Sequence, residues 1–253
     1  MKKLLEKFEN FRKKHPVPKK LRTPLAILSL LLWVAIASIG VQYLVGYLLL
    51  WTIGVDGLGI NMFNVLYQVI SYAVTLFLVI YVPYKISKKG KTTREEIGLK
   101  GWPTWTDIWL SPLGFIAATL IAMALAALFS LFPWFNADEA QNIGYTTLLY
   151  GGDRIFSFIA TAIIAPIVEE IVFRGWLYGK IRSRLNMFAS IFIVSLLFGL
   201  VHMQWNVGVN VFATSIVLCA LREMTGTIYS GILVHIIKNG IAFYLVYVMG
   251  MSL

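Results

Sequence analysis

Five ionisable side chains interrupt stretches of this sequence that are otherwise apolar. They are Glu169, Glu170, Arg174, His202 and His235. On insertion scales, a charged side chain at the centre of a membrane helix costs about 2.5–3.5 kcal/mol. These side chains are therefore expected to face protein or trapped water rather than lipid, and to mark a functional site.

The spacing within the first group gives its two carboxylates different surroundings. Glu170 and Arg174 are four residues apart and share a helical face, where they can form an ion pair. Glu169 points about 100° away on a 3.6-residue period, which leaves it available for another partner. Pro166 lacks a backbone N–H and should kink the same helix, so one carbonyl there needs another partner or water.

The two histidines have polar or aromatic neighbours at helical spacing. His235 and Asn239 are four residues apart and present an imidazole and an amide on one face. Phe198 stands four residues before His202, where its ring would wall the imidazole off from lipid, fix its rotamer, or pack in the core. Lys238 is next to Asn239, and we expect it to pair with Glu170 or to face a wet cavity.

A carboxylate, two imidazoles and an amide, with no serine or cysteine nucleophile motif nearby, are suited to activating water. In this interpretation Glu169 takes a proton from a water that His202 also holds. His235 and Asn239 would then donate hydrogen bonds to the oxyanion on a scissile carbonyl. Alternatively, Glu169, His202 and His235 hold a catalytic zinc ion, although no HExxH motif is present. The spacing does not choose between the two.

Composition places these residues in a membrane. The chain has 253 residues, of which 58% are hydrophobic and only 13% charged, and its mean hydropathy is +0.76. The apolar runs lack the two-residue alternation of a barrel, so the expected fold is an all-α polytopic bundle. We expect about seven spans, or eight with one further crossing, and a polar cavity between the fourth, fifth and seventh. The runs lie at 24–50, 62–84, 108–133, 155–178, 187–203, 207–221 and 227–250.

The net charge of +10 is explained by topology rather than by nucleic acid. If seven spans alternate, nineteen of the 22 lysines and arginines fall on one side. The positive-inside rule places that side, with the N-terminus, in the cytoplasm of a multi-pass protein of the cell membrane. We predict that residues 1–23 form a basic amphipathic cytoplasmic segment and that residues 24–253 form the membrane domain. We expect the site to be reached from the cytoplasm.

Three motifs in three separate stretches resemble one known family. EEIVFR at 169–174 matches E-E-x-x-x-R, FGLVH at 198–202 matches F-x-x-x-H, and HIIKN at 235–239 matches H-x-x-x-N. The chain thus resembles the CAAX protease and bacteriocin-processing enzymes, which include the type II CAAX prenyl proteases. The resemblance covers about residues 150–245 and implies intramembrane endopeptidase activity, with Glu169 and both histidines essential.

The resemblance leaves the substrate and the metal open. Family members act on prenylated proteins, peptide pheromones or bacteriocins, so the expected partners are the bilayer and a hydrophobic or lipidated peptide. The family is described both as zinc-dependent and as metal-free, and we favour the metal-free glutamate mechanism. Two other functions fit less well: a non-catalytic scaffold or bacteriocin-immunity protein, and a proton-coupled transporter, for which the two related halves are missing.

Overall fold

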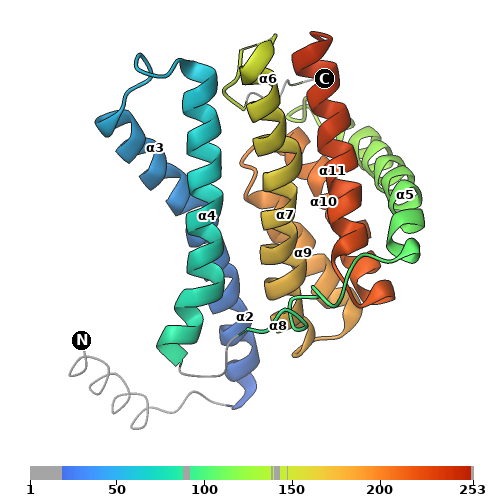
Figure 1. Ribbon diagram of the computed structural model, residues 1–253. Helices are drawn as coiled ribbons and strands as arrows, with labels where there is room; N and C mark the ends of the chain where they lie inside the picture. Colours follow the sequence, from blue (N-terminus) through green and yellow to red (C-terminus); the bar gives the residue numbers. More distant parts are fainter. Residues whose placement is uncertain (1–18, 88–91, 138, 140–142, 147, 252–253) are drawn as a thin grey trace, which may run out of the picture.

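The computed structural model describes residues 19–87, 92–137, 139, 143–146 and 148–251 (Figure 1). All regular structure in these residues is helical, and they contain no strand. The predicted all-α, polytopic class is confirmed. The expected amphipathic segment at the N-terminus falls almost entirely outside the described residues.

The spans lie close to the predicted apolar runs, and in the described part of the chain six helices are long and apolar enough to cross a membrane. Residues 187–203, expected to form the fifth span, contain a shorter apolar helix. Figure 1 shows the first helices as one flank, α5 as the other, and α7 and α11 between them. The first three spans comprise α2 Lys19–Ala35 with η1 Ile36–Gly40 and α3 Val41–Thr52, then α4 Ile60–Ser87, then α5 Trp105–Phe129. The later spans end with α10 Trp205–Thr225, and with α11 Tyr229–Phe243 continued by η4 Tyr244–Val248.

The fourth span is irregular around its motif. It runs as α6 Gly151–Phe158, η2 Ile159–Ile164, α7 Ala165–Glu169, η3 Glu170–Leu177 and α8 Tyr178–Arg182, where both η segments are π-helical. In η2 the hydrogen bonds skip one residue more than in an α-helix, since the Ala165 N–H donates to the Ala160 carbonyl. π turns within α-helices are frequent at functional sites, and here they flank the two adjacent glutamates.

The fifth apolar helix ends inside the membrane. It is α9 Met187–Leu200, whose 14 residues span about 21 Å at 1.5 Å per residue, against about 30 Å for the hydrocarbon core. A tight turn follows, in which Met203 has φ +56°. His202 lies in this turn and not within a helix, so its expected place inside the fifth span is wrong. The reason is that the apolar residues Val201 and Met203 extended the expected run to residue 203, three residues past the end of α9.

Glycine lets α9 and α10 touch beside this turn. A Cβ atom added to Gly199 would lie 2.8 Å from the carbonyl oxygen of Gly208, and one added to Gly208 would lie 3.1 Å from that of Gly199. Small residues commonly permit such close backbone contact between membrane helices. The crossing fixes where α9 ends, and with it the position of His202.

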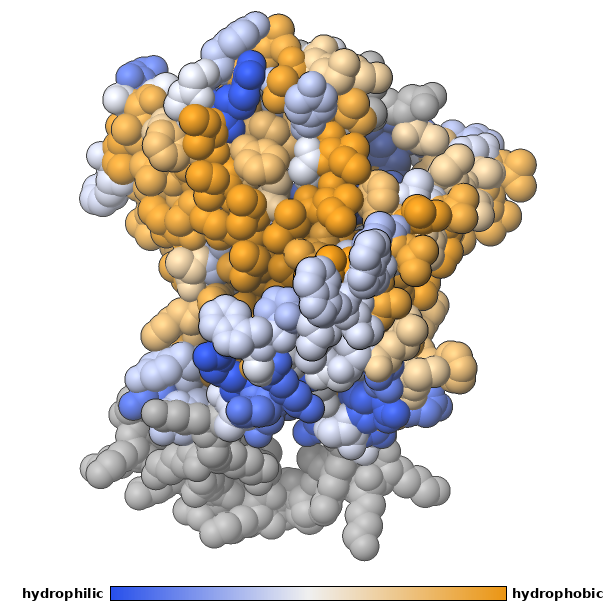
Figure 2. Space-filling model, turned by 45° about the vertical axis from the view of Figure 1, so that its right-hand side comes forward, coloured by the Kyte–Doolittle hydropathy of each residue, from blue (hydrophilic) through white to orange (hydrophobic). Residues whose placement is uncertain are grey.

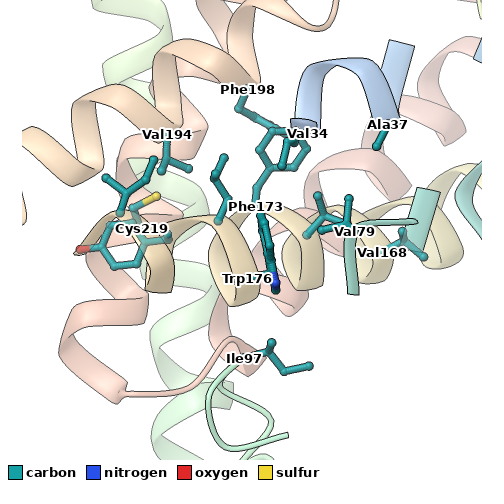
Figure 3. Close-up of a cluster of buried hydrophobic side chains, with 14 of the residues drawn as sticks. Val34, Ala37, Val79, Ile97, Val168, Phe173, Trp176, Val194, Phe198 and Cys219 are labelled. Carbon is teal, nitrogen blue, oxygen red and sulfur yellow. The ribbon is translucent and has the colours of Figure 1, made fainter. Parts of the chain in front are cut away.

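The largest hydrophobic cluster of the described residues extends from Phe198, beside the motif residues, to Ile181 and joins several spans. Figure 3 shows Phe173 and Trp176 from the fourth span beside Val79, and Cys219 nearby. Leu177 and Ile181 have no exposed surface. This end of the bundle is therefore a packed apolar plug.

The outer surface matches a bilayer environment. Figure 2 shows a broad apolar belt above a hydrophilic band. Exposed tryptophans mark both ends of α5, with Trp105 and Trp109 at its start and Trp134 just beyond its end. Such aromatic side chains concentrate at membrane–water interfaces, so the chain is a multi-pass membrane protein with α5 spanning the full bilayer.

Candidate active site

A cavity of about 720 Å³ brings the motif residues together. The fourth and seventh spans, α9 and the turn after it contribute the members that the sequence singled out: Glu169, Phe198, His202, His235, Lys238 and Asn239. The cavity also has walls from η1, α3, α4 and the first turns of α10, which the sequence did not predict. Non-helical backbone at membrane depth must face protein or water. The polar lining of the cavity meets this requirement for the turn at His202.

A continuous series of polar contacts runs through the site. The Tyr72 hydroxyl donates to Glu169 Oε1 at 2.7 Å, and Glu169 Oε2 lies 3.7 Å from His235 Nε2. His235 Nδ1 lies 3.1 Å from Glu170 Oε1. Arg174 Nη1 donates to that same oxygen at 2.8 Å. The two glutamates therefore face opposite nitrogens of one imidazole.

Glu170 and Arg174 are completely buried, with no exposed side-chain surface. An ion pair that is removed from water needs further contacts to offset its lost hydration. The Arg174 guanidinium has such a contact, because its carbon lies 4.1 Å from the centroid of the Phe198 ring. Gly231 leaves room on the other side, since a Cβ atom there would lie 3.0 Å from Glu170 Oε2.

Phe198 touches all three motifs. Besides Arg174, its ring contacts His202 edge-on at 5.0 Å between centroids and His235 at 6.0 Å. Phe198 is 1% exposed. Both imidazoles therefore pack against the buried ring of Phe198.

The partners of the two histidines determine their tautomers. His202 Nδ1 lies 2.7 Å from the Phe198 carbonyl oxygen, which can only accept, so Nδ1 carries the proton. His235 Nδ1 likewise donates to the carboxylate of Glu170. In their neutral forms, both rings therefore keep Nε2 as a hydrogen-bond acceptor.

Asn239 is hydrogen-bonded to the backbone of the fourth span, within the π-helical segment η2. Its Nδ2 donates to the Thr161 carbonyl at 3.2 Å. In the register set by Ala165 and Ala160, the donor for Thr161 would be the next residue, Pro166, which has no N–H. Asn239 supplies the missing donor, and its second amide hydrogen and its oxygen remain for other partners.

Tyr72 is the site residue that the sequence interpretation missed. Gln68, Ser71, Tyr72 and Thr75 all line the cavity from α4. Their spacing of three and four residues is that of one helical face, and Thr75 donates to the Ala37 carbonyl across to η1. A row of polar residues on one face of an otherwise apolar span was the feature of the sequence that could have placed Tyr72 in the site.

The residues suggested for zinc have suitable donor atoms but not a suitable arrangement. Histidines that bind a metal commonly donate their other ring N–H to a carbonyl or carboxylate. His202 and His235 each have such a contact at Nδ1. In the described part of the chain, however, no three His, Cys, Asp or Glu side chains are grouped so that they could hold a metal ion. As arranged here, Glu169, His202 and His235 do not fit a metal.

The segment that carries all three motifs is similar to a known protein family. Residues 151–241 match the family model described as type II CAAX prenyl endopeptidase Rce1-like. This segment is therefore similar to that family. The resemblance drawn from the motifs is confirmed, and Tyr72 lies outside the matched segment.

A curated protein supports the same relationship over a longer range. The "Putative membrane peptidase YdiL" of Bacillus subtilis (strain 168) is 25% identical over 178 residues, which are 69% of this chain and 68% of that protein. No solved structure matches the chain.

Proposed function

We propose that this membrane protein is an intramembrane endopeptidase that hydrolyses a peptide bond with water activated by Glu169 and His202. One observation carries the proposal: His202 Nδ1 is bound to the Phe198 carbonyl oxygen, which leaves its Nε2 as an acceptor in the same cavity as Glu169. The Rce1-like segment and the similarity to a peptidase point to the same class of reaction.

In the proposed reaction, a water is held between the Glu169 carboxylate and His202 Nε2. Glu169 accepts a proton from this water while the oxygen attacks the scissile carbonyl carbon. The tetrahedral intermediate then collapses, the C–N bond breaks, and the proton passes from Glu169 to the departing amine. Tyr72 holds one oxygen of the carboxylate during these steps.

The developing oxyanion requires donors, for which we propose Asn239 and His235. Asn239 would use the amide hydrogen that is not bound to Thr161. His235 can donate through Nε2 only when both ring nitrogens are protonated, because Nδ1–H is directed at Glu170.

For the substrate, we propose a hydrophobic or lipidated peptide or protein at the membrane. The type II CAAX description of the matched segment supports a prenylated peptide, and an unprenylated pheromone-like or bacteriocin-like peptide fits the same cavity. No metal is included, because the acidic and histidine side chains are not arranged as a ligand group.

The proposal is tested with purified protein, a panel of prenylated and unprenylated peptides, and mass spectrometry with and without a chelator. We expect one cleaved bond, unaffected by the chelator, and loss of cleavage in Glu169→Ala and His202→Ala. Ser183→Ala, in an exposed loop away from the cavity, is the matched control. Retained cleavage in both site variants would exclude the mechanism, and a cellular phenotype indifferent to Glu169→Gln would favour a scaffold.

A further inference from the structure

The two ends of the bundle differ in charge. In Figure 1, the start of α2 and α8 lie at the lower end, and the start of α6 and the end of η4 at the upper end. The upper end of the described chain carries Asp56, Glu139 and Asp153 against Arg154. The lower end is basic on balance: Lys85, Arg94, Lys100, Lys180, Arg182, Arg184 and Arg222 outnumber Glu95, Glu96, Asp107 and Glu223.

The cavity belongs to the upper half of the bundle. Its lining includes residues of the loop after α5, among them Phe135, Glu139 and Ile143, and Asn206 from the first turn of α10. It continues to Tyr247, near the upper end of the last span. Among the described residues, none in the loops at the basic end lines it.

Below the site, the structure is closed by side-chain packing. Phe173 contacts Phe198 edge-on at 4.9 Å between centroids, directly above the apolar plug of Trp176, Leu177 and Ile181. Phe173 and Trp176 are at most 4% exposed. Packing of this kind leaves no space for a peptide or for bulk water.

Hydrogen bonds reinforce the closure at the basic end. The Thr227 hydroxyl donates to the buried carboxylate of Asp107 at 3.1 Å, and the Ile228 N–H donates to the Gly98 carbonyl at 3.1 Å. Arg222 donates to the carbonyl of Glu96 at 3.3 Å. The loop before α5 is thus bound to the turn between α10 and α11.

We infer that the site is loaded from the side of the membrane opposite the basic end. By the positive-inside rule this is the extracytoplasmic side, so the substrate is a peptide segment exposed at the outer face. The inference rests on the proposed function and reverses the expectation of access from the cytoplasm. Carboxamides on the wall, from Gln42, Gln68 and Asn210, suit the backbone of an extended peptide, because an amide both donates and accepts.

Sided labelling of single cysteines tests the inference without needing catalysis. The background is Cys219→Ala, which removes the protein's one cysteine. Asn206→Cys reports on the cavity and Ser183→Cys on the basic loop. With a membrane-impermeant maleimide, we expect Asn206→Cys to label in right-side-out vesicles only, and Ser183→Cys in inverted vesicles only.

Two labelling results would overturn the inference. One is that Asn206→Cys labels from the same side as Ser183→Cys. The other is that Asn206→Cys stays unlabelled from both sides although it labels in detergent. Labelling of the two positions from opposite sides, with Ser183→Cys reached from outside, would overturn the assigned orientation.

A sided cleavage assay separates this inference from the proposed function. A water-soluble peptide that the purified enzyme cleaves is added outside sealed vesicles, with Glu169→Gln as the inactive control. We expect cleavage with right-side-out vesicles and its loss with inverted ones. Cleavage only by inverted vesicles overturns the access route, whereas no cleavage by purified protein, with the expected labelling intact, overturns the proposed function alone.

Discussion

The guanidinium carbon of Arg174 lies 4.1 Å from the centroid of the Phe198 ring, and both side chains are buried. A cation stacked on an aromatic face away from water is stabilised by about 2 kcal/mol. The contact joins the first motif to the second, and the same ring supports both imidazoles. The three motifs are therefore one packed unit.

Replacing the ring should weaken this unit. We expect Phe198→Leu to lower stability by about 2 kcal/mol or more, because the cation–π contact and both histidine contacts are lost. Thermal unfolding in detergent measures the effect. Phe192→Leu, an exposed position of the same helix, should leave the midpoint almost unchanged, and an equal shift in both variants would contradict the special role of Phe198.

Tyr72 should affect turnover rather than binding. A hydrogen bond to a charged group contributes about 1.5–3 kcal/mol, so Tyr72→Phe is expected to reduce kcat about tenfold to a hundredfold. KM should change little, because the hydroxyl holds Glu169 rather than the substrate. Steady-state kinetics on the cleaved peptide measure both, and Tyr81→Phe, an exposed position of α4, is the control. Unchanged kcat in Tyr72→Phe would remove Tyr72 from the site.

The buried ion pair predicts a double-mutant result. Arg174→Met should destabilise the protein by about 3–5 kcal/mol, because the Glu170 carboxylate loses its cation in a site without water. Adding Glu170→Gln removes the uncompensated charge, so the double variant should be more stable than Arg174→Met. Thermal unfolding of the two single variants and the double variant measures the coupling. Strictly additive effects would be inconsistent with the pair described here.

Asn239 and Pro166 offer a way to separate structure from catalysis. Asn239→Ala should destabilise the protein, because the Thr161 carbonyl loses its donor. In Pro166→Ala/Asn239→Ala, a restored backbone N–H can serve that carbonyl, so stability should recover. Peptide cleavage should remain impaired in the double variant if Asn239 also stabilises the oxyanion. Recovery of cleavage together with stability would restrict Asn239 to a structural role.

Much of the fold follows from apolar run length, and that is why six spans agree with the expected stretches. The π turns beside Glu169 could not be predicted, because one extra residue in a turn leaves composition unchanged. The turn at His202 was hidden for a related reason. Val201 and Met203 on either side of His202 are apolar, so the expected run was extended through residue 203 although α9 ends at Leu200.

The site was only partly visible in the sequence. Intramembrane charge identified the glutamates and histidines, because each is costly unless it faces protein or water. Tyr72 carries no charge and comes from a distant span, so only the row of polar residues beside it could have revealed it. The side on which the cavity opens depends on side-chain packing at the basic end, which spacing along the chain does not encode.

Because α9 ends early, the structure around His202 depends on the bilayer that surrounds the protein. A 14-residue helix leaves about a third of the hydrocarbon thickness above it to be filled by loop, side chains and water. A membrane with longer acyl chains would surround that polar region with more lipid, and the bilayer would have to thin locally around it at an energetic cost. Bilayer thickness is therefore expected to tune how readily water and peptide reach His202.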